Sequence, residues 1–459
     1  MMDSLTYLAA VHSMPRFLRS TMIAWLALSA ATTHPAVSIN LGESVIALNG
    51  PWKFHTGDDP LWAAADFNDS TWETIDLTPA QGSHDGDVGL RNYVPGWGAR
   101  GHRGYAGFAW YRMSVRVNDT GDSAIYLVGP AAVDNGYQLF FNGRLVGGIG
   151  DLTRSPPSIV SIQPRRFALP RAWWTPNDGK LSGVIAFRVA SLQGTSASAD
   201  GGGIHIAPLI GTGTGASDYY RLEWLQTVEG YAVDAAEPFL FLALAIMALC
   251  LVPFDRKERL YPWLAATLVL LALARANQPI FFLWQFETIR EFALWRLTIV
   301  DAFTFAAWTM AWSACFGLQD ARWIKISTAI LTVAYLVTRV LSTPVLSPSL
   351  PAGVSHAFAT ALQFVRYGFV LLSAYIFYRG ISRHARADWI ALSAMLLGGI
   401  GVFASELSRL GVPGIWFPYG VGVSRTEYAY VAFDVALFVY LLHRLWRFSP
   451  ARPARVLAE

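Results

Sequence analysis

The chain has 459 residues, of which 53% are hydrophobic and 15% are charged, and its formal net charge is +3. A composition this apolar is typical of membrane proteins, so the domain count expected of a soluble chain of this length does not apply. The small net charge gives no reason to expect a nucleic-acid partner. The two cysteines, Cys250 and Cys315, lie in apolar runs, so the first half has neither a disulfide nor a thiolate metal ligand. We expect no cofactor and no bound metal.

Residues 1–36 have the pattern of an export signal and leader. Arg16 and Arg19 precede the apolar run 22–28, and small residues follow it. The run is too short to span a membrane as a mature helix, so we expect cleavage just after it. An uncleaved anchor helix is the alternative, and Met14 is an alternative start of the chain.

Alternation of apolar and polar residues predicts an all-β domain over residues 37–215. In the run 110–117, four apolar side chains share one face, and Arg112, Ser114 and Arg116 share the other. Short strands separated by Gly and Pro are typical of a β-sandwich or jelly roll.

Three further runs support this prediction. The run 137–146 predicts a hairpin, because Asn142-Gly143 supplies the two positive-φ residues of a tight turn. The runs 125–128 and 184–189 have the length and composition of strands. We expect Trp52, Trp62, Trp72 and Trp110 to lie in the core, because their spacing suits inward-facing strand positions.

The order of several short motifs in this domain resembles the sugar-binding jelly-roll domain of family-two glycoside hydrolases, a galactose-binding-like fold. The motifs are the segment 50–60 followed by Trp62, then 67–72, 107–112, the turn 141–143 and 202–204. In those hydrolases the domain is an accessory, and the catalytic carboxylate pair lies in a separate barrel. The sequence that follows here is not such a barrel, so the resemblance implies carbohydrate binding and does not imply hydrolysis.

A Gly-rich stretch over residues 82–105 is the predicted ligand-binding site of this domain. Sugar sites combine an aromatic ring that stacks on the sugar with Asp, Arg and His side chains that bind hydroxyls. The candidate residues are His84, Asp85, Asp87, Trp97, Arg100, His102, Arg103 and Tyr105. Calcium binding by Asp85 and Asp87 is an alternative, although two carboxylates are far short of a full ligand shell. A loop held by its own hydrogen bonds is the other alternative.

Residues 216–236 form the predicted juxtamembrane coupling segment. Leu222, Leu225 and Val228 recur at helical spacing among charged residues, which is typical of an amphipathic helix. Such a helix would couple the sandwich to the membrane domain, and a simple linker is the alternative.

Residues 237–447 contain seven apolar runs near the length that crosses a bilayer, which predicts a seven-helix transmembrane domain in the lipid bilayer. The expected spans are 238–254, 260–276, 297–317, 326–345, 357–378, 390–406 and 427–446. An exported first domain and an odd number of spans place the tail 448–459 in the cytoplasm. We therefore expect a multi-pass protein of the bacterial inner membrane with a periplasmic sandwich.

The distribution of loop cations supports this orientation, because Lys and Arg are in excess on the cytoplasmic side of membrane proteins. The predicted inner segments contain Arg256, Lys257, Arg259, Arg322, Lys325, Arg379, Arg383, Arg386, Arg444, Arg447, Arg452 and Arg455. The predicted outer segments contain Arg275, Arg290, Arg296, Arg409 and Arg425.

An exported β-domain followed by seven helices resembles the bacterial seven-transmembrane receptors with diverse intracellular signalling modules. The resemblance implies that the outer domain senses a ligand, often a carbohydrate, and that the helices pass the signal to a cytoplasmic effector enzyme. Here only residues 448–459 follow the last span, too few for an effector domain. We expect a separate cytoplasmic effector as partner; a shortened gene product is the alternative.

Ionisable residues within membrane spans are candidates for function, because burying a charge in lipid is costly. Those within or near the expected spans are Asp301, Arg339, Arg366, Glu406 and Asp434. The sequence predicts either a network of Asp301 and Asp434 with Arg339 and Arg366 that changes on signalling, or fixed structural pairing and snorkelling to the interface.

The sequence contains no G-x-S-x-G nucleophile motif, phosphate loop or H-E-x-x-H motif, so we do not expect an enzyme. The function predicted is a receptor for an extracytoplasmic small-molecule ligand, carbohydrate being one class. A transporter, or transporter component, with a carbohydrate-capturing domain is the alternative, and a homodimer is left open. Transporter spans are expected to be broken by Gly or Pro in both halves, and only the run 397–401 has that character.

Overall fold

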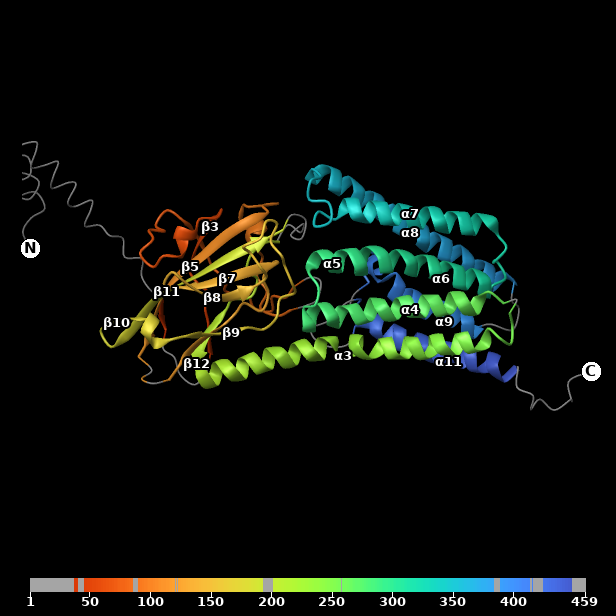
Figure 1. The fold of residues 1–459 in the computed structure, drawn as a ribbon, viewed down its shortest axis with the longest axis horizontal. Helices are drawn as coiled ribbons and strands as arrows, with labels where there is room; N and C mark the ends of the chain where they lie inside the picture. Colours follow the sequence, from red (N-terminus) through yellow and green to blue (C-terminus); the bar gives the residue numbers. More distant parts are fainter. Residues whose placement is uncertain are drawn as a thin grey trace, which may run out of the picture.

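The computed structural model has a β-rich N-terminal part and an all-helical C-terminal part that lie end to end (Figure 1). It describes residues 37–39, 45–85, 90–119, 121, 123–192, 201–256, 258–383, 389–412, 415 and 424–447. The predicted signal 1–36, the candidate Asp87 and the tail 448–459 lie outside these residues.

The N-terminal part contains two β-sheets. The larger has the strand order β4-β3-β5-β11-β7-β8, with β1 beside β5 and β10 beside β11; the smaller has the order β2-β12-β6-β9. The strands of the larger sheet are β1 Val37–Ile39, β3 Trp52–Thr56, β4 Glu73–Ile75, β5 Gly107–Asn118, β7 Gly136–Phe141, β8 Arg144–Ile149, β10 Thr175–Asn177 and β11 Lys180–Ser191. Those of the smaller sheet are β2 Val45–Ala47, β6 Ile125–Val128, β9 Arg166–Leu169 and β12 Leu209–Thr212. The two sheets confirm the predicted sandwich-like fold of the N-terminal domain.

The four strand predictions are confirmed. The run 110–117 lies within β5, 125–128 coincides with β6, and 184–189 lies within β11. The hairpin of β7 and β8 turns at Asn142 and Gly143, whose φ angles are 47° and 80°. Both residues have the positive φ that this tight turn requires.

The side chains of β5 alternate as predicted, but both faces are covered. Tyr111, Met113, Val115 and Val117 lie in the core between the sheets. On the opposite face, Arg112 is also buried, with 1% of its surface exposed, because the segment 59–72 covers it and its Nε donates to Asp69 at 2.9 Å. A pattern of strand residues shows which side chains share a face, but not what packs on that face.

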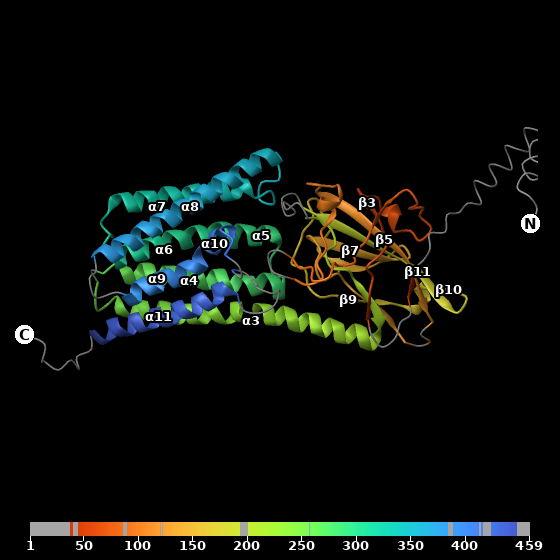
Figure 2. The same cartoon turned by 180° about the vertical axis from the view of Figure 1, so that it is seen from behind.

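The C-terminal part is a bundle of helices. Its elements are α3 Gly213–Leu251, α4 Leu260–Pro279, a π-helical turn Ile280–Trp284, α5 Ile289–Leu294, a second π-helical turn Trp295–Val300, α6 Asp301–Cys315, α7 Arg322–Ser342, α8 Ala352–Arg383, α9 Trp389–Val402, α10 Ala404–Arg409 and α11 Arg425–Arg447. The sandwich lies at one end of the bundle, and α3 and α11 end at the opposite end (Figures 1 and 2).

In the described residues, five helices are long and apolar enough to cross a membrane, and they cover five of the seven predicted spans. They are Gly213–Leu251, Leu260–Trp284, Arg322–Ser342, Ala352–Ser382 and Arg425–Arg447. The expected spans 297–317 and 390–406 fall on α6, with 15 residues, and α9, with 14 residues. A π-helical turn precedes α6, and Phe403 separates α9 from α10 in a non-helical conformation, so neither helix reaches spanning length by itself.

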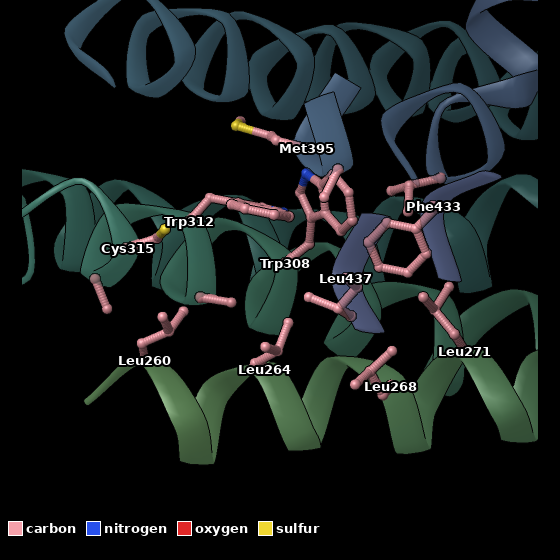
Figure 3. Close-up of a cluster of buried hydrophobic side chains, with 14 of the residues drawn as sticks. Leu260, Leu264, Leu268, Leu271, Trp308, Trp312, Cys315, Met395, Phe433 and Leu437 are labelled. Carbon is pink, nitrogen blue, oxygen red and sulfur yellow. The ribbon is translucent and has the colours of Figure 1, made fainter. Parts of the chain in front are cut away.

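Apolar faces hold the bundle together. Leu260, Leu264, Leu268 and Leu271 recur on one face of α4 and lie near Trp308, Trp312, Phe433 and Leu437 (Figure 3). Helix α9 lies close to α11 because Gly401 has no side chain: a Cβ there would be 2.1 Å from the ring of Tyr430.

Candidate functional site

Several side chains of the sandwich loop predicted to bind a ligand form hydrogen bonds within the sandwich, mostly to residues outside the loop. Arg100 donates from Nε to the carbonyl oxygen of Pro95 at 3.1 Å and from Nη2 to that of Asp76 at 2.8 Å. His102 pairs with Glu73 at 3.0 Å, and the Tyr105 hydroxyl donates to the carbonyl oxygen of Phe108 at 2.7 Å. These contacts favour the alternative of an ordered surface loop, and ligand binding there stays a prediction.

The remaining loop candidates differ in exposure. Trp97 is 1% exposed and lies in the core between the sheets, so its ring is not available to stack on a sugar. His84 and Arg103 are exposed, and the ring Nδ1 of His84 contacts the carbonyl oxygen of Asp85 at 3.0 Å. The backbone amide of Asp85 donates to the carbonyl oxygen of Leu90 at 2.9 Å.

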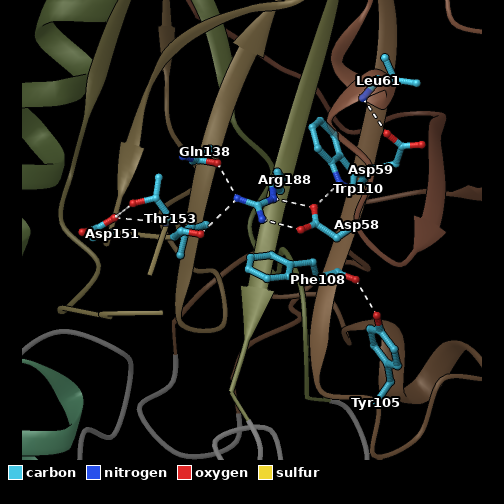
Figure 4. A network of polar contacts seen from close by, with 11 residues as sticks. Asp58, Asp59, Leu61, Tyr105, Phe108, Trp110, Gln138, Asp151, Thr153 and Arg188 are labelled. Atoms are coloured by element: carbon cyan, nitrogen blue, oxygen red, sulfur yellow. Dashed lines mark hydrogen bonds and ion pairs between the residues drawn. The ribbon is translucent and has the colours of Figure 1, made fainter. Parts of the chain in front are cut away.

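A second polar cluster on the larger sheet was not predicted. Arg188 of β11 donates from Nε to Asp58 at 2.7 Å and from Nη1 to Gln138 at 2.9 Å (Figure 4). Its guanidinium lies 3.9 Å from the centre of the Phe108 ring, a cation–π contact. Arg188 therefore joins three strands of the sheet, since Phe108 lies on β5 and Gln138 on β7.

Three of the five predicted intramembrane residues, Asp301, Arg366 and Glu406, form ion pairs in the described residues, and none of these pairs belongs to the predicted switch network. The Nη2 of Arg366 donates to Glu406 at 2.8 Å, and its guanidinium lies over the ring of Phe305. Asp301 pairs with Arg296, five residues earlier, across the π-helical turn, whose i to i+5 spacing puts both residues on one face. In the part of the chain that the structure describes, no ion pair joins Arg339 to Asp301 or Asp434.

The largest concentration of buried charge surrounds Arg275, which the sequence placed among the outer-loop cations. The guanidinium of Arg275, on α4, lies 2.7 Å from Asp234 and 2.5 Å from Glu237, both of α3, and 3.2 Å from Glu427 of α11. The three acidic side chains are at most 5% exposed. These four residues are called the Arg275 cluster below; it ties three helices together and has two more carboxylates than cations.

Local structure explains how these side chains reach one point. Asp234 and Glu237 are three residues apart and share a face of α3. Glu427 forms a capping box with Ser424: one of its oxygens accepts from the Ser424 amide at 2.6 Å, and the other binds Arg275. A cavity of about 60 Å³ adjoins the cluster, and its lining includes Arg275, Arg296, Asp301 and Tyr430. The sequence did contain a signal for this site. Arg275 lies at the end of the expected span 260–276, and Asp234 and Glu237 lie on one helix face just before the expected span 238–254.

Sandwich and bundle also meet at a hydrogen-bonded junction, formed by residues 159–165 and 280–289. The Ser161 hydroxyl donates to the carbonyl oxygen of Phe281 at 2.7 Å, and the Gln163 amide donates to those of Phe282 and Leu283 at 2.8 and 3.0 Å. The Gln285 side chain donates back to the Ser161 carbonyl oxygen at 2.5 Å. Carbonyls at a helix end have no partner within the helix, so the sandwich satisfies those at the end of the first π-helical turn.

We expect the double variant Ser161→Ala/Gln163→Ala to loosen this junction. It removes three hydrogen bonds, each worth about 1 kcal/mol, and leaves partly buried carbonyls without a donor. Amide hydrogen exchange of full-length protein in nanodiscs should become faster over 280–289. Ser158→Ala is the control, because that residue contacts Asp151 through its backbone. Unchanged protection in the double variant would show that these bonds do not hold the junction.

Comparisons with known proteins give partial likenesses. No protein-family model and no curated protein matches the chain. Among solved structures, it is similar to β-glucuronidase 2 of Bacteroides uniformis, at 19% identity and a TM-score of 0.26, over 37% of this chain and 18% of that one. It is similar to a β-glycosidase of Bacteroides vulgatus, at 19% identity and a TM-score of 0.25, over 37% and 20%. It is also similar to a β-glucuronidase of Bifidobacterium dentium, at 17% identity and a TM-score of 0.22, over 34% of this chain and 22% of that one.

The chain thus spans about a fifth of the length of these structures. Glycoside hydrolase family 2 is named for a further match, a β-glucuronidase at 18% identity and a TM-score of 0.25. Likeness at this level assigns neither an activity nor a ligand to this chain, and the sandwich is established by its own two sheets.

Proposed function

We propose that the protein is a membrane signal-transduction receptor, in which the sandwich senses an extracytoplasmic ligand and the helices relay the signal to a separate cytoplasmic effector. The observation that carries the proposal is the continuity of α3. This helix of 39 residues begins directly after β12 and runs without a break into the bundle, where Asp234 and Glu237 bind Arg275. A continuous helix anchored in both parts transmits displacement, which a flexible linker would absorb.

The junction supplies a second connection between the same two parts. Tyr231 of α3 stacks on Phe282, with ring centres 4.7 Å apart, and Phe282 accepts a hydrogen bond from Gln163 of the sandwich. A change in the sandwich therefore reaches α3 and the end of α4 together. Two contacts on different helices favour a relative movement of those helices as the output.

The charges at the two ends of the bundle support a sandwich outside the cell and a cytoplasmic end of α11, an arrangement in which α6 and α9 complete seven passes with the five longer helices. At the end far from the sandwich lie Arg256, Arg259, Arg322, Lys325, Arg444 and Arg447. On the sandwich side, Arg275, Arg296 and Arg366 are paired with buried or half-buried carboxylates. The exposed cations on this side are Arg290, Arg409 and Arg425. The excess of unneutralised cations lies at the far end, which is the distribution expected for a cytoplasmic side in a bacterial inner membrane.

A second copy of the chain is the homomeric partner that we propose. Leu222, Leu225 and Val228, in the part of α3 beside the sandwich, are 47%, 55% and 48% exposed. Apolar side chains exposed outside the lipid favour contact with another protein surface.

Saccharide binding and uptake test the proposal against the transporter alternative. Full-length protein in nanodiscs is titrated with a panel of neutral mono- and oligosaccharides by calorimetry, and uptake of the same labelled sugars is measured in proteoliposomes. The receptor is expected to bind without uptake, and hydrogen exchange over 280–289 is expected to change on binding. Saturable uptake would contradict the receptor proposal and support the transporter alternative.

A matched pair of variants locates the binding. Arg103→Ala, in the exposed part of the predicted loop, is expected to weaken binding by roughly tenfold, the effect of one hydrogen bond to a charged group. Arg154→Ala, also at an exposed arginine but elsewhere on the sandwich, should leave binding unchanged. Equal binding by both variants would remove the loop 82–105 from the site.

A further inference from the structure

Asp434, in the middle of α11, is a buried carboxyl group that the receptor proposal leaves without a role. The residue is 7% exposed, and neither carboxyl oxygen has a hydrogen-bond partner among the described residues. An ionised carboxylate in such surroundings loses its hydration without compensation, which costs several kcal/mol.

The helix geometry directs Asp434 toward the Arg275 cluster. It follows Glu427 by seven residues, about two turns of an α-helix, so the two side chains share a face of α11. Glu427 on that face reaches Arg275, and Tyr430 lies between the two acids. Asp434 is thus the innermost member of a row of acidic groups that starts at the sandwich side.

The charged groups on the neighbouring helices do not neutralise Asp434. From α3, Glu237 acts on it electrostatically, with Asp234 one turn away from Glu237. From α4, Arg275 is already shared by three carboxylates. From α6, Asp301 is paired with Arg296, and α9, which packs on α11, contains no ionisable residue in Trp389–Val402. The charged group that acts on Asp434 from these helices is therefore of the same sign.

A proton is the cation that fits this place. The described residues contain no group of three His, Cys, Asp or Glu side chains that could hold a metal ion. Hard metal cations require about six oxygen ligands, whereas a proton needs only the carboxyl oxygen that binds it. Protonation removes the charge at once and turns the group into a neutral acid.

We propose that Asp434 is a proton-binding site of the helix bundle, occupied in the arrangement in which Glu237 lies beside it. The proton is taken from water and returned to water, with no other bond made or broken. Because Glu237 belongs to α3, a displacement of α3 changes the like charge that Asp434 faces and with it the occupancy of the site. This last step rests on the proposed receptor function; the occupancy itself does not.

Infrared difference spectroscopy of the full-length protein in nanodiscs tests the site during a pH titration without ligand. The wild type is expected to show the carbonyl-stretch band of a protonated carboxylic acid, shifted in heavy water. Asp434→Asn should lose this band, and Asp434→Glu should move it. Asp320→Asn, the same change at an exposed residue, should leave the band unaltered.

Each outcome decides the assignment. A band that persists in Asp434→Asn and is lost in Glu237→Gln would place the proton on Glu237 and overturn the proposal. Absence of any protonated band in the wild type would do the same. If Asp434→Asn does not fold, the shift in Asp434→Glu decides. Since no sugar is added, a failure to bind saccharide leaves this result untouched.

Discussion

Replacement of Arg275 by methionine is expected to destabilise the bundle by about 3–5 kcal/mol. The substitution keeps much of the side-chain volume but leaves Asp234, Glu237 and Glu427 buried around a point from which the cation has gone. Breaking a buried ion pair by removing one partner has a cost of this size, because the remaining charge is uncompensated. The measurement is thermal and denaturant unfolding of full-length protein in the same detergent or nanodisc.

The matched control is Arg425→Met, which removes an arginine from the exposed first residue of α11. We expect a change within about 0.5 kcal/mol there, as for surface substitutions in general. Arg275→Lys should recover only part of the loss, because an ammonium group cannot present the planar fork that reaches three carboxylates. Equal stability of the Arg275→Met and Arg425→Met variants would show that the Arg275 cluster does not hold α3, α4 and α11 together.

Gly230→Pro is expected to uncouple the sandwich from the bundle. Gly230 lies in the interior of α3, four residues before Asp234, so a proline there removes one helical hydrogen bond and clashes with the carbonyl of the preceding turn. The local cost is about 3 kcal/mol, and the resulting kink changes the direction in which α3 leaves the sandwich. Hydrogen exchange over 280–289 should become faster and should no longer respond to a bound ligand.

The variant Gly230→Ala distinguishes the effect of the kink from the effect of losing the glycine. A Cβ at this position has no heavy atom within 4 Å, so alanine fits without a clash and should stabilise the helix by up to about 1 kcal/mol. The alanine variant should keep full coupling. If the proline variant kept the wild-type exchange pattern as well, α3 would not be the element that connects the two parts.

Much of the architecture follows from local patterns. The strand runs in the first half and the apolar runs in the second appear as elements of the structure, because side-chain periodicity and burial are encoded residue by residue. The number of helices long enough to cross the membrane did not follow from these local patterns. The run 297–317 is apolar enough, yet a π-helical turn precedes α6, and such a turn depends on packing against neighbouring helices.

The predicted sugar site in the loop 82–105 also shows what local sequence patterns leave undetermined. Trp97, Arg100, His102 and Tyr105 have the chemistry of a sugar site, and the structure uses much of that chemistry to hold the loop. Composition names the side chains that can bind hydroxyls, but the partners that they meet come from segments distant in the sequence, such as Glu73 for His102.

By itself the sequence determined the order of the parts: a β-domain, then a connecting segment, then membrane-class helices. It determined this because hydrophobic periodicity and run length are local properties. Only the tertiary structure decided that the connecting segment is the start of an unbroken helix, and that Arg275 holds Asp234, Glu237 and Glu427. These charges lie on three helices, up to 193 positions apart between Asp234 and Glu427. An isolated charge at the end of an apolar run is indistinguishable from a loop charge until the fold brings its partners to it.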